Sequence, residues 1–408
     1  MVNWKRNLAV LCFVQLVTMI GFSGFFPFVA YHLMDLGITD TDQAATYLAI
    51  FNSGNAAAMM IAAPIWGAIA DKHGRRMMLI RATAAGCIFT FLMGAAQSPQ
   101  QLIIARIIQG AFSGTVAAAV TLVSTETPEQ YLARSLGIVQ TAQFIGQTVG
   151  PLLGGYAADS FGYKNVFYLS SALILLSVFA TIAFVRETKR AKVAPEPRRR
   201  RSLKEAIAAL GNRNTVILVI TLAGNSFAIA VLSPVLSLYI KALIGNVPNL
   251  ATIAGWVMSV AAFSSSLSAV LLGRLADKLG QKKILVACVL GIALIHIPQA
   301  MVSTPGQLVF LRAVQGLFMG GIMPTANALL ARSTASSHRG AVFGFAHSAQ
   351  AGGRSLGPIL GAGVANAWGM PSAFLVTATV FGIMSLLVTL FVHTSEAAAE
   401  EVPPAQAA

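Results

Sequence analysis

Two sets of polar side chains recur at helical spacing within otherwise apolar sequence. Their members are Gln140, Gln143 and Gln147 and, 207 positions later, His347, Gln350 and Arg354. Side chains three and four residues apart share one face of a helix, so each set predicts a polar stripe along one helix. Polar groups inside apolar segments are costly unless they face a cavity or each other. We therefore expect one water-accessible substrate cavity between two related helices, although any single residue could instead make only an interhelical hydrogen bond.

Other amides and two aromatic rings are further candidates for lining this cavity. The amides are Asn52, Asn55, Asn225 and Asn327, and the rings are Phe25 and Phe144. Ligand cavities are mostly apolar with a few placed polar groups, and these residues could supply both. For each amide, an interhelical hydrogen bond explains its presence equally well.

Few charged side chains fall inside the apolar segments. Arg106, Arg312 and Arg354 do so, with His347 beside them, whereas the 14 acidic residues fall at segment ends or in loops. This balance predicts a positive cavity that favours neutral or anionic amphiphiles over lipophilic cations. Arg106 could instead be structural, held by Gln109 and by backbone carbonyls.

Proton coupling would require a titratable group near the cavity. Asp35, just past the first apolar segment, and Glu126, at the inner end of the fourth, are the nearest acids. His347 is the alternative carrier, because an unperturbed imidazole titrates near neutral pH. Both alternatives are consistent with the sequence.

The composition predicts the elements that must position these groups. Hydrophobic residues make up 56% of the 408 residues and charged residues only 10%, whereas a soluble domain has about a quarter charged. The chain is therefore predicted to be an all-α membrane protein, because helices satisfy their own backbone hydrogen bonds in lipid and roughly 20 apolar residues cross a bilayer. The expected spans are twelve, at 8–32, 44–70, 77–97, 101–123, 132–156, 164–185, 214–240, 251–275, 283–303, 307–330, 340–366 and 371–393.

The net charge of +14 follows the expected membrane topology. Under these spans, 23 of the 28 Lys and Arg residues fall on the side of the N-terminus, and only Lys164 and Lys241 fall on the other. The acidic residues on that opposite side are Asp35, Asp40, Asp42 and Asp159. The excess of Lys and Arg in cytoplasmic loops predicts that both termini are cytoplasmic, and no nucleic-acid partner is needed to explain the charge.

Landmarks repeat at a constant offset and divide the chain into two six-helix bundles. Gly67–Met77 is matched by Gly273–Lys283, and Arg106–Gly110 by Arg312–Gly316, both 206 positions later. We expect pseudo-symmetric bundles at 1–185 and 214–394, a basic cytoplasmic linker at 186–213 and a disordered tail at 395–408. A capping pattern at 202–205 predicts a short helix within the linker.

Three motifs carry a resemblance to a known family. They are Gly67-x-x-x-Asp71-Lys72-x-Gly74-Arg75-Arg76, Arg106-x-x-Gln109-Gly110 and Gly146-x-x-x-Gly150-Pro151-x-x-Gly154-Gly155. The chain resembles the major facilitator superfamily, and more narrowly its twelve-span proton-coupled drug antiporters. The third motif resembles the one typical of antiporters.

The first motif, by this resemblance, implies a conformational latch of Gly67, Asp71, Gly74, Arg75 and Arg76 that holds the outward-facing state. A carboxylate near helix N-termini, paired with arginine, suits that role. The second copy keeps Asp277 and Lys282 but has Gln281 in place of the first arginine, so its latch should be weaker. A turn that merely follows the charge rule is the alternative.

Glycines at four-residue intervals form a stripe in each half. They are Gly146, Gly150 and Gly154 in the first half and Gly353, Gly357 and Gly361 in the second. Small residues at this interval let helices approach closely, and Pro151 and Pro358 favour bends. We expect the two halves to meet along these stripes.

The expected function is secondary active export of small amphiphilic drugs or metabolites by proton antiport, with multidrug efflux and antibiotic resistance as consequences. No phosphate-binding loop, nucleophile or metal cluster is evident, so neither ATP, a cofactor nor enzyme activity is expected. The expected partners are the substrate, protons and the lipid bilayer, for a monomer in the bacterial inner membrane. A uniporter or proton-coupled importer of a sugar or metabolite is the main alternative; a non-transporting sensor or an enzyme is more distant.

Overall fold

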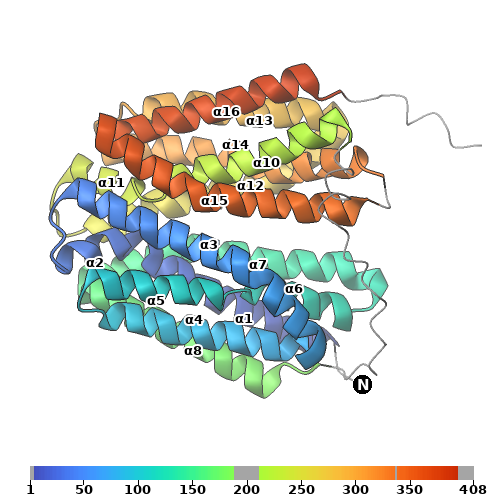
Figure 1. Ribbon diagram of the computed structural model, residues 1–408, viewed down its shortest axis with the longest axis horizontal. Helices are drawn as coiled ribbons and strands as arrows, with labels where there is room; N and C mark the ends of the chain where they lie inside the picture. Colours follow the sequence, from blue (N-terminus) through green and yellow to red (C-terminus); the bar gives the residue numbers. More distant parts are fainter. Residues whose placement is uncertain (1–3, 188–210, 336–337, 394–408) are drawn as a thin grey trace, which may run out of the picture.

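The computed structural model describes residues 4–187, 211–335 and 338–393. Within them the chain forms long helical segments that run side by side along the molecule, and no strand is found there (Figure 1). The residues 188–210, most of the expected linker with its predicted short helix, and the expected tail from 395 lie outside the described part.

Six segments make up the first half of the chain. They are α1 (Trp4–Phe25) continued by η1 (Phe26–Phe28) and α2 (Val29–Asp35), α3 (Thr41–His73), α4 (Arg75–Ala95), α5 (Pro99–Ala111) with α6 (Thr115–Glu126), α7 (Glu129–Phe161) and α8 (Tyr163–Phe184). Six more make up the second half. They are α10 (Arg213–Val231) with α11 (Leu236–Ile244), α12 (Leu250–Leu279), α13 (Gln281–Gln299), α14 (Pro305–Arg332), α15 (Arg339–Trp368) and α16 (Pro371–Phe391). The twelve predicted spans are confirmed, with ends that differ by five residues at most.

Local capping explains several of these ends. Ser98 and Thr304, 206 positions apart, cap α5 and α14 with their hydroxyls and are each followed by proline at the first helical position. Both features are favourable at a helix start, because they satisfy or remove otherwise free N–H groups. Gly74 and Gly280 take positive φ values of 89° and 97° between consecutive helices, a conformation open to glycine at no steric cost.

Ten of the segments are long and apolar enough to cross a membrane by themselves. The two others, α7 and α15, are equally long but carry the polar stripes and the glycines, which lower their hydropathy. Each packs against a helix of its own half and a helix of the other half, α7 on α1 and α12, and α15 on α10 and α3. Each therefore has protein neighbours on two sides, and the buried polar residues Gln143 and Gln350 lie on the protein-facing surfaces.

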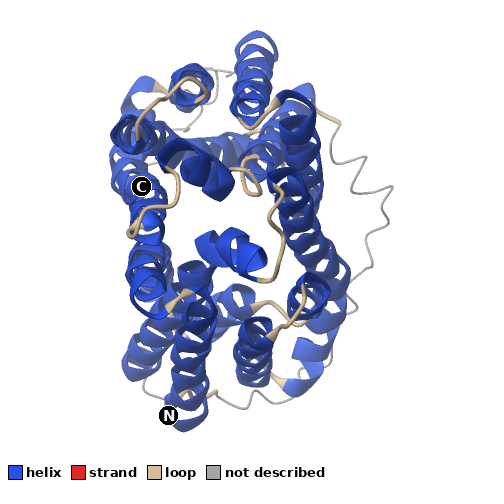
Figure 2. Cartoon of the chain, turned by 90° about the vertical axis from the view of Figure 1, so that its left-hand side faces the viewer, coloured by secondary structure: helices blue, strands red, loops and turns tan. Residues whose placement is uncertain are grey.

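The two halves lie one above the other in Figure 1, and Figure 2 looks onto the end that carries α2 and α11. We call this the α2/α11 end and the opposite one, where Trp4 and His393 lie, the termini end. A single buried apolar cluster spans both halves at the α2/α11 end. Two other clusters lie separately, one within each half. The halves are therefore fused at the α2/α11 end.

Hydrogen bonds between described residues of the two halves support this arrangement. The Tyr31 hydroxyl donates to the carbonyl oxygen of Ser237 at 2.9 Å, and the Ser237 hydroxyl donates to that of Pro27 at 2.8 Å. Nearer the middle of the molecule, Ser355 Oγ donates to the carbonyl oxygen of Ser53 at 3.4 Å. The space between the halves is thus closed from the α2/α11 end.

The glycine stripes do not join the halves, which corrects the expectation from the sequence. A side chain at Gly146, Gly150 or Gly154 would collide with the first segment, and one at Gly353, Gly357 or Gly361 would collide with α10. The stripes therefore pack helices within one half. Neighbouring residues make the contact between halves instead: Gly155 lies against Ala251, and the carbonyl of Pro151 lies against Gly255.

The fourth segment of each half differs. The sequence predicted one helix over 101–123, but α5 ends at Ala111 and α6 begins at Thr115, with Gly114 at φ +126° between them. Side chains donate hydrogen bonds to the backbone carbonyl groups at this break. Trp66 Nε1 donates to the carbonyl oxygen of Ala111 at 2.6 Å, and Arg81 Nη2 donates to that of Ser113 at 3.0 Å. The related segment α14 is unbroken over its whole length.

Candidate functional site

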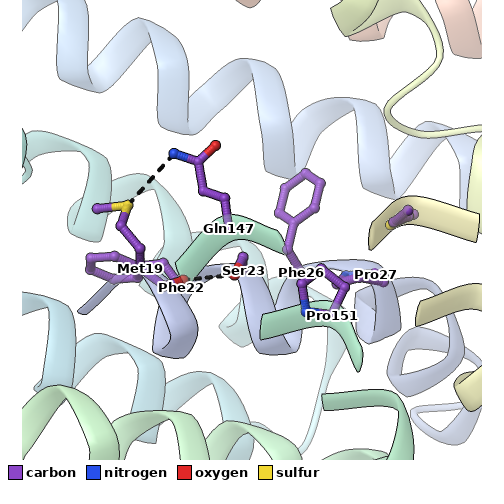
Figure 3. A pocket seen from close by; sticks show the side chains of 8 residues that line it. Met19, Phe22, Ser23, Phe26, Pro27, Gln147 and Pro151 are labelled. Carbon is purple, nitrogen blue, oxygen red and sulfur yellow. Dashed lines mark hydrogen bonds between the residues drawn. The ribbon is translucent and has the colours of Figure 1, made fainter. Parts of the chain in front are cut away.

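A cavity of about 250 Å³ lies between the first segment, α7 and α12. Its lining residues are Met19, Phe22, Ser23, Phe26, Pro27, Gln147, Pro151 and Met258 (Figure 3). Ser23 Oγ is occupied with the carbonyl oxygens of Met19 and Gly146, at 2.7 and 3.0 Å. The amide of Gln147 is therefore the main polar group that the cavity can offer to a ligand, on a wall of rings and thioethers typical of sites for apolar molecules.

In both predicted polar stripes, the middle residue is buried and the two outer residues are exposed. The middle residues are buried within their own halves: Gln143 Nε2 donates to Gln15 Oε1 at 3.0 Å, and Gln350 Oε1 accepts from Ser226 Oγ at 3.5 Å. The outer members Gln140, Gln147, His347 and Arg354 are exposed. The middle pair therefore fits the interhelical explanation, and the outer pairs remain candidates for contact with substrate.

The predicted amides also divide into packing and possible contact residues. Asn52 Nδ2 donates across the halves to Ser233 Oγ at 3.2 Å, and Asn55 Nδ2 to the carbonyl oxygen of Arg106 at 3.0 Å. Asn225 is buried with no partner for Oδ1 among the described residues, and Asn327 is partly buried.

The two rings predicted to line the cavity behave differently. Phe25 is fully buried, so the prediction that it lines the cavity is wrong, and its neighbour Phe26 lines it instead. Phe26 begins the 3₁₀ segment η1, which packs against α7 and α12 on either side of the cavity. Phe144 is 40% exposed and lies on the same helix as the first polar stripe.

Arg106 and Arg312 occupy related positions but have different surroundings. Each donates Nη1 to the glutamine three residues later, Gln109 at 2.6 Å and Gln315 at 2.9 Å. Each also has a buried Nε without a partner among the described residues. Because no acid neutralises these guanidinium groups there, both halves keep a positive charge beside the central space.

Three phenylalanine rings surround the Arg106 guanidinium. Its Cζ lies 5.7 Å from the ring centre of Phe25, 5.9 Å from that of Phe26 and 4.9 Å from that of Phe51, distances at which a cation is attracted to a ring. Arg312 is set among amides instead, since Gln299 Nε2 donates to Gln315 Oε1 at 3.1 Å. Tyr239 in turn donates to the carbonyl oxygen of Gln299 at 3.2 Å.

The carboxylate found at the start of α4 is that of Glu187. Its two oxygens accept from the backbone N–H groups of Arg75 and Arg76 at 2.8 and 2.9 Å. An acid at a helix N-terminus is favoured by the helix dipole. Sequence reasoning assigned this role to Asp71, whose side chain lies outside the described part, and missed Glu187 because it follows the sixth span, far away in sequence.

In the second copy of this loop, Gln281 stands at the position of Arg75, and two side-chain contacts are found among the described residues. Gln281 Nε2, at the start of α13, donates to Oδ1 of Asp277, near the end of α12, at 2.9 Å, and Lys282 Nζ donates to the carbonyl oxygen of Thr389 at 2.9 Å. The related contact in the first half is made by Arg76 Nη2, which donates to the carbonyl oxygen of Ile182 at 2.7 Å. Gly67 has open space around it.

Comparison with protein families identifies this architecture. The family model described as Major Facilitator Superfamily matches residues 11–247 and 218–408. The chain belongs to the major facilitator superfamily. It is accordingly a secondary transporter rather than an enzyme, built of twelve helices in the all-α fold that the sequence predicted.

Curated relatives place this superfamily member near the multidrug resistance proteins. It is 34% identical over 380 residues to the multidrug resistance protein MdtG of Enterobacter lignolyticus (strain SCF1), covering 93% of this chain and 90% of the relative. The MdtG of Escherichia coli (strain K12 / DH10B) is 34% identical over 381 residues, covering 93% and 92%. The bacterial relatives and the many apolar helices make this superfamily member a multi-pass inner-membrane protein.

Solved structures of the superfamily share the fold at low identity. A bacterial homologue of the human lysosomal transporter Spinster, inward-facing and unoccupied, matches with a TM-score of 0.77 at 13% identity, covering 96% of this chain and 97% of that one. The nucleoside transporter NupG matches with a TM-score of 0.76 at 16% identity, covering 96% and 100%.

The proton-carrier candidates of this superfamily member are all accessible. Asp35 at the end of α2 is exposed, as is His347 on α15, and Glu126 at the end of α6 is partly buried. The acids of the described helices lie at or near helix ends, as the sequence indicated.

Three charged or titratable groups inside the helices were missed. Arg81 lies within the expected span 77–97, and its Cζ lies 3.6 Å from the ring centre of Trp66. His32 and His296 are only 2% and 1% exposed, and His296 Nδ1 lies 2.7 Å from the carbonyl oxygen of Ile292. The expectation that only three arginines and His347 lie inside the spans is therefore wrong; counting charges at the depth of each helix could have found the others.

Proposed function

We propose that this chain exports small amphiphilic compounds across the inner membrane in exchange for protons, by alternating access between its two halves. The observation that carries the proposal is the similarity to MdtG multidrug resistance proteins over 93% of the chain. The fusion of the halves at one end and their separate cores toward the other supports alternating access, because a substrate can then be reached from one side at a time. Both halves of the site lie in one chain, so we propose that it acts as a monomer.

The distribution of charge supports an orientation with both termini in the cytoplasm. The termini end carries basic residues such as Lys5, Arg75, Arg76 and Arg213, whereas the α2/α11 end carries Lys164 and Lys241 among several aspartates. Cytoplasmic loops are enriched in Lys and Arg. The described state is then closed toward the outside.

The substrate class we propose is neutral or anionic. Arg106 and Arg312 keep unpartnered N–H groups among the described residues, and the exposed Arg354 adds a third positive charge on α15. Buried or partly buried positive charge attracts anions more strongly than charge in water. The amides of Gln140, Gln147 and Asn327 and the imidazole of His347 would supply further polar contacts around it.

Inside-out vesicles with an imposed pH gradient test the exchange. A coupled exporter accumulates substrate inside the vesicles and dissipates the gradient, whereas a uniporter equilibrates substrate and leaves the gradient intact. An importer would move substrate in the opposite direction. Either of the last two results would overturn the proposal.

The preference for anions is tested in the same vesicles by Arg354→Gln. We expect uptake of an anionic amphiphile to fall by about tenfold and uptake of a neutral one to change little, because a charge-assisted contact contributes roughly 1.5–3 kcal/mol. Arg332→Gln is the matched control, since this exposed arginine ends α14 at the termini end. Equal loss for lipophilic cations would refute the preference.

A further inference from the structure

The side chain of Phe26 borders two empty spaces of the molecule. One is the cavity of about 250 Å³ between the first segment, α7 and α12, where the ring stands on the same side as the Gln147 amide (Figure 3). The other is a smaller void where the two halves meet, lined also by Asn52, Ser233 and Ser237. Phe26 is the one described residue that lines both spaces, so it forms a wall that they share.

The same ring covers the guanidinium group of Arg106. The Cζ atom of Arg106 lies 5.9 Å from the ring centre of Phe26, within the range of a cation–π contact. Arg106 does not line the cavity, and of the three rings around it Phe26 is the one that does. An aromatic ring therefore stands between the apolar cavity and this cation.

Arg106 keeps the capacity to bind an acidic group. Its Nη1 donates to Gln109, while its Nε has no partner among the described residues. An aromatic ring attracts a cation without accepting its N–H groups as a carboxylate does, and charge-assisted hydrogen bonds are the stronger contacts. An acidic group that reached Arg106 from the cavity would therefore be favoured there, but it would first have to displace the ring of Phe26.

The second half shows that the fold does not require a ring at this position. Phe26-Pro27 is matched 207 positions later by Ser233-Pro234, the same offset that relates the two polar stripes. Ser233 lines the same small void as Phe26, and its hydroxyl accepts from Asn52 Nδ2 at 3.2 Å. Because a small side chain occupies the related position, packing alone does not account for the ring of Phe26.

The local backbone suits a movement of this ring. Phe26 begins the 3₁₀ segment η1, and Pro27 at its second position has no N–H group to donate. A short 3₁₀ stretch within a long helix often marks a hinge. The cavity of about 250 Å³ is also smaller than the roughly 300–1,000 Å³ of most ligand pockets. A ring that turned aside would enlarge the site and connect it to Arg106.

Resting on the proposed function, we propose that Phe26 determines the charge preference of the substrate site. With its ring in place, the cavity holds the apolar body of a neutral amphiphile. An acidic group is bound only when the ring moves aside and uncovers Arg106. Phe26 therefore limits the binding of anions without contacting the acidic group, and removing the ring should favour anions selectively.

Two probes of nearly equal shape test this. Naphthoate is an anion and naphthamide is its neutral counterpart, so a difference between them reports the effect of charge. Equilibrium dialysis at neutral pH measures the binding of each radiolabelled probe to the full-length protein in lipid nanodiscs, with binding to empty nanodiscs subtracted. For Phe26→Ala we expect the ratio of naphthoate affinity to naphthamide affinity to rise about tenfold or more. Both probes lose the same apolar contact, whereas naphthoate gains a charge-assisted one.

Three further variants make the result specific. Phe26→Leu keeps an apolar side chain of smaller reach, so it should give a smaller rise, and it serves as the test if Phe26→Ala does not fold. Met258→Ala, which changes the α12 wall of the cavity, should weaken both probes alike and leave the ratio unchanged. Combining Phe26→Ala with Arg106→Gln should abolish the rise, because the two side chains are then coupled through the same contact.

An unchanged ratio in Phe26→Ala, or a rise that survives in the double variant, would overturn the proposal, and so would a wild type that binds neither probe. A ring that serves packing alone would lower the unfolding temperature when removed, without changing the ratio. Because dialysis requires neither a gradient nor transport, a uniporter or importer could still show the rise and an exporter could lack it. Failure of the proposed export and failure of this proposal are thus recognised separately.

Discussion

Arg106 and Arg312 are positively charged residues at related positions of the two repeats, but the side chains around them differ. Both lie in the fourth helix of their half and donate to the glutamine that follows. Around Arg106 are three phenylalanine rings, whereas Arg312 lies in a chain of amides that includes Gln299. Aromatic rings attract the cation without satisfying its N–H groups. We infer that the first half presents the more available cation to a substrate.

The same comparison distinguishes two kinds of feature in each half. One is the close contact of helices that both halves share, which we call the frame, and the other is the surroundings of the fourth helix, which differ. The close approach of α7 to α1 is repeated by that of α15 to α10, with Gly154 against Gly24 and Gly361 against Val231. The break between α5 and α6 occurs only in the first half. The repeats have thus kept the close helix contacts of α7 and α15 and differ in the fourth segment, at its break and around its arginine.

Replacing a close-packed glycine of the frame by alanine should have the largest effect on stability, and the effect should be equal in the two halves. Gly154→Ala and Gly361→Ala each place a Cβ onto a backbone carbonyl of the facing helix. We expect each to lower the free energy of unfolding by about 3 kcal/mol or more, at the upper end for overpacked sites. Thermal unfolding of the purified protein measures this.

Gly137→Ala and Gly363→Ala are the matched controls, because nothing lies within 4 Å of a Cβ at either glycine. Both should be neutral or slightly stabilising, since alanine favours a helix over glycine. If one half tolerated its substitution and the other did not, the shared frame would be refuted.

Replacing the two arginines should have a smaller and unequal effect. Arg106→Gln should reduce transport of an anionic substrate by about 10- to 100-fold, the equivalent of one lost charge-assisted contact, whereas Arg312→Gln should cost less than about tenfold because its amide neighbours can re-pair. Arg106→Lys should not rescue, since lysine lacks the planar group that packs over rings; Arg312→Lys should. Initial transport rates in vesicles measure the effect of all four variants. If both Gln variants lost the same activity and both Lys variants recovered it equally, the surroundings of the two arginines would not differ in function.

The smallest effect concerns the helix break. Trp66→Phe removes the Nε1 donor to the Ala111 carbonyl while keeping most of the ring over which Arg81 stacks. An unsatisfied buried carbonyl costs about 1–3 kcal/mol, so the unfolding temperature should fall. Trp256→Phe in the second half, at a 55% exposed position, should leave it unchanged. A stable Trp66→Phe variant would show that the break needs no such donor.

The sequence predicted what depends on composition and regular spacing. Span positions follow from apolar length, and helix starts follow from residues such as Ser98 and Thr304. The superfamily follows from its motifs. Each polar stripe lies on one helix, as predicted. Three residues at spacings of three and four nevertheless cover enough of a helix surface that Gln143 and Gln350 are buried while the outer members are exposed.

What escaped prediction depends on contacts between distant segments. The local sequence Phe112-Ser113-Gly114 allows a helix to continue, and the break is stable because Trp66 and Arg81 supply donors from other helices. Glu187 caps a helix more than 100 residues away in sequence. The glycine stripes indicate close packing, but not which helix is the neighbour. Predicting which distant segments contact each other requires the topology of the fold as well as the local motif.

The apolar cluster shared by both halves has a consequence for the resting molecule. Parting the halves at the α2/α11 end would uncover residues such as Phe25, Tyr31 and Leu236 that are now almost fully enclosed, whereas at the termini end each half has a separate core. With the cytoplasmic termini that we propose, the substrate-free transporter should therefore rest open toward the cell interior. Binding of substrate, of protons or of both must then drive the change to the outward-open state.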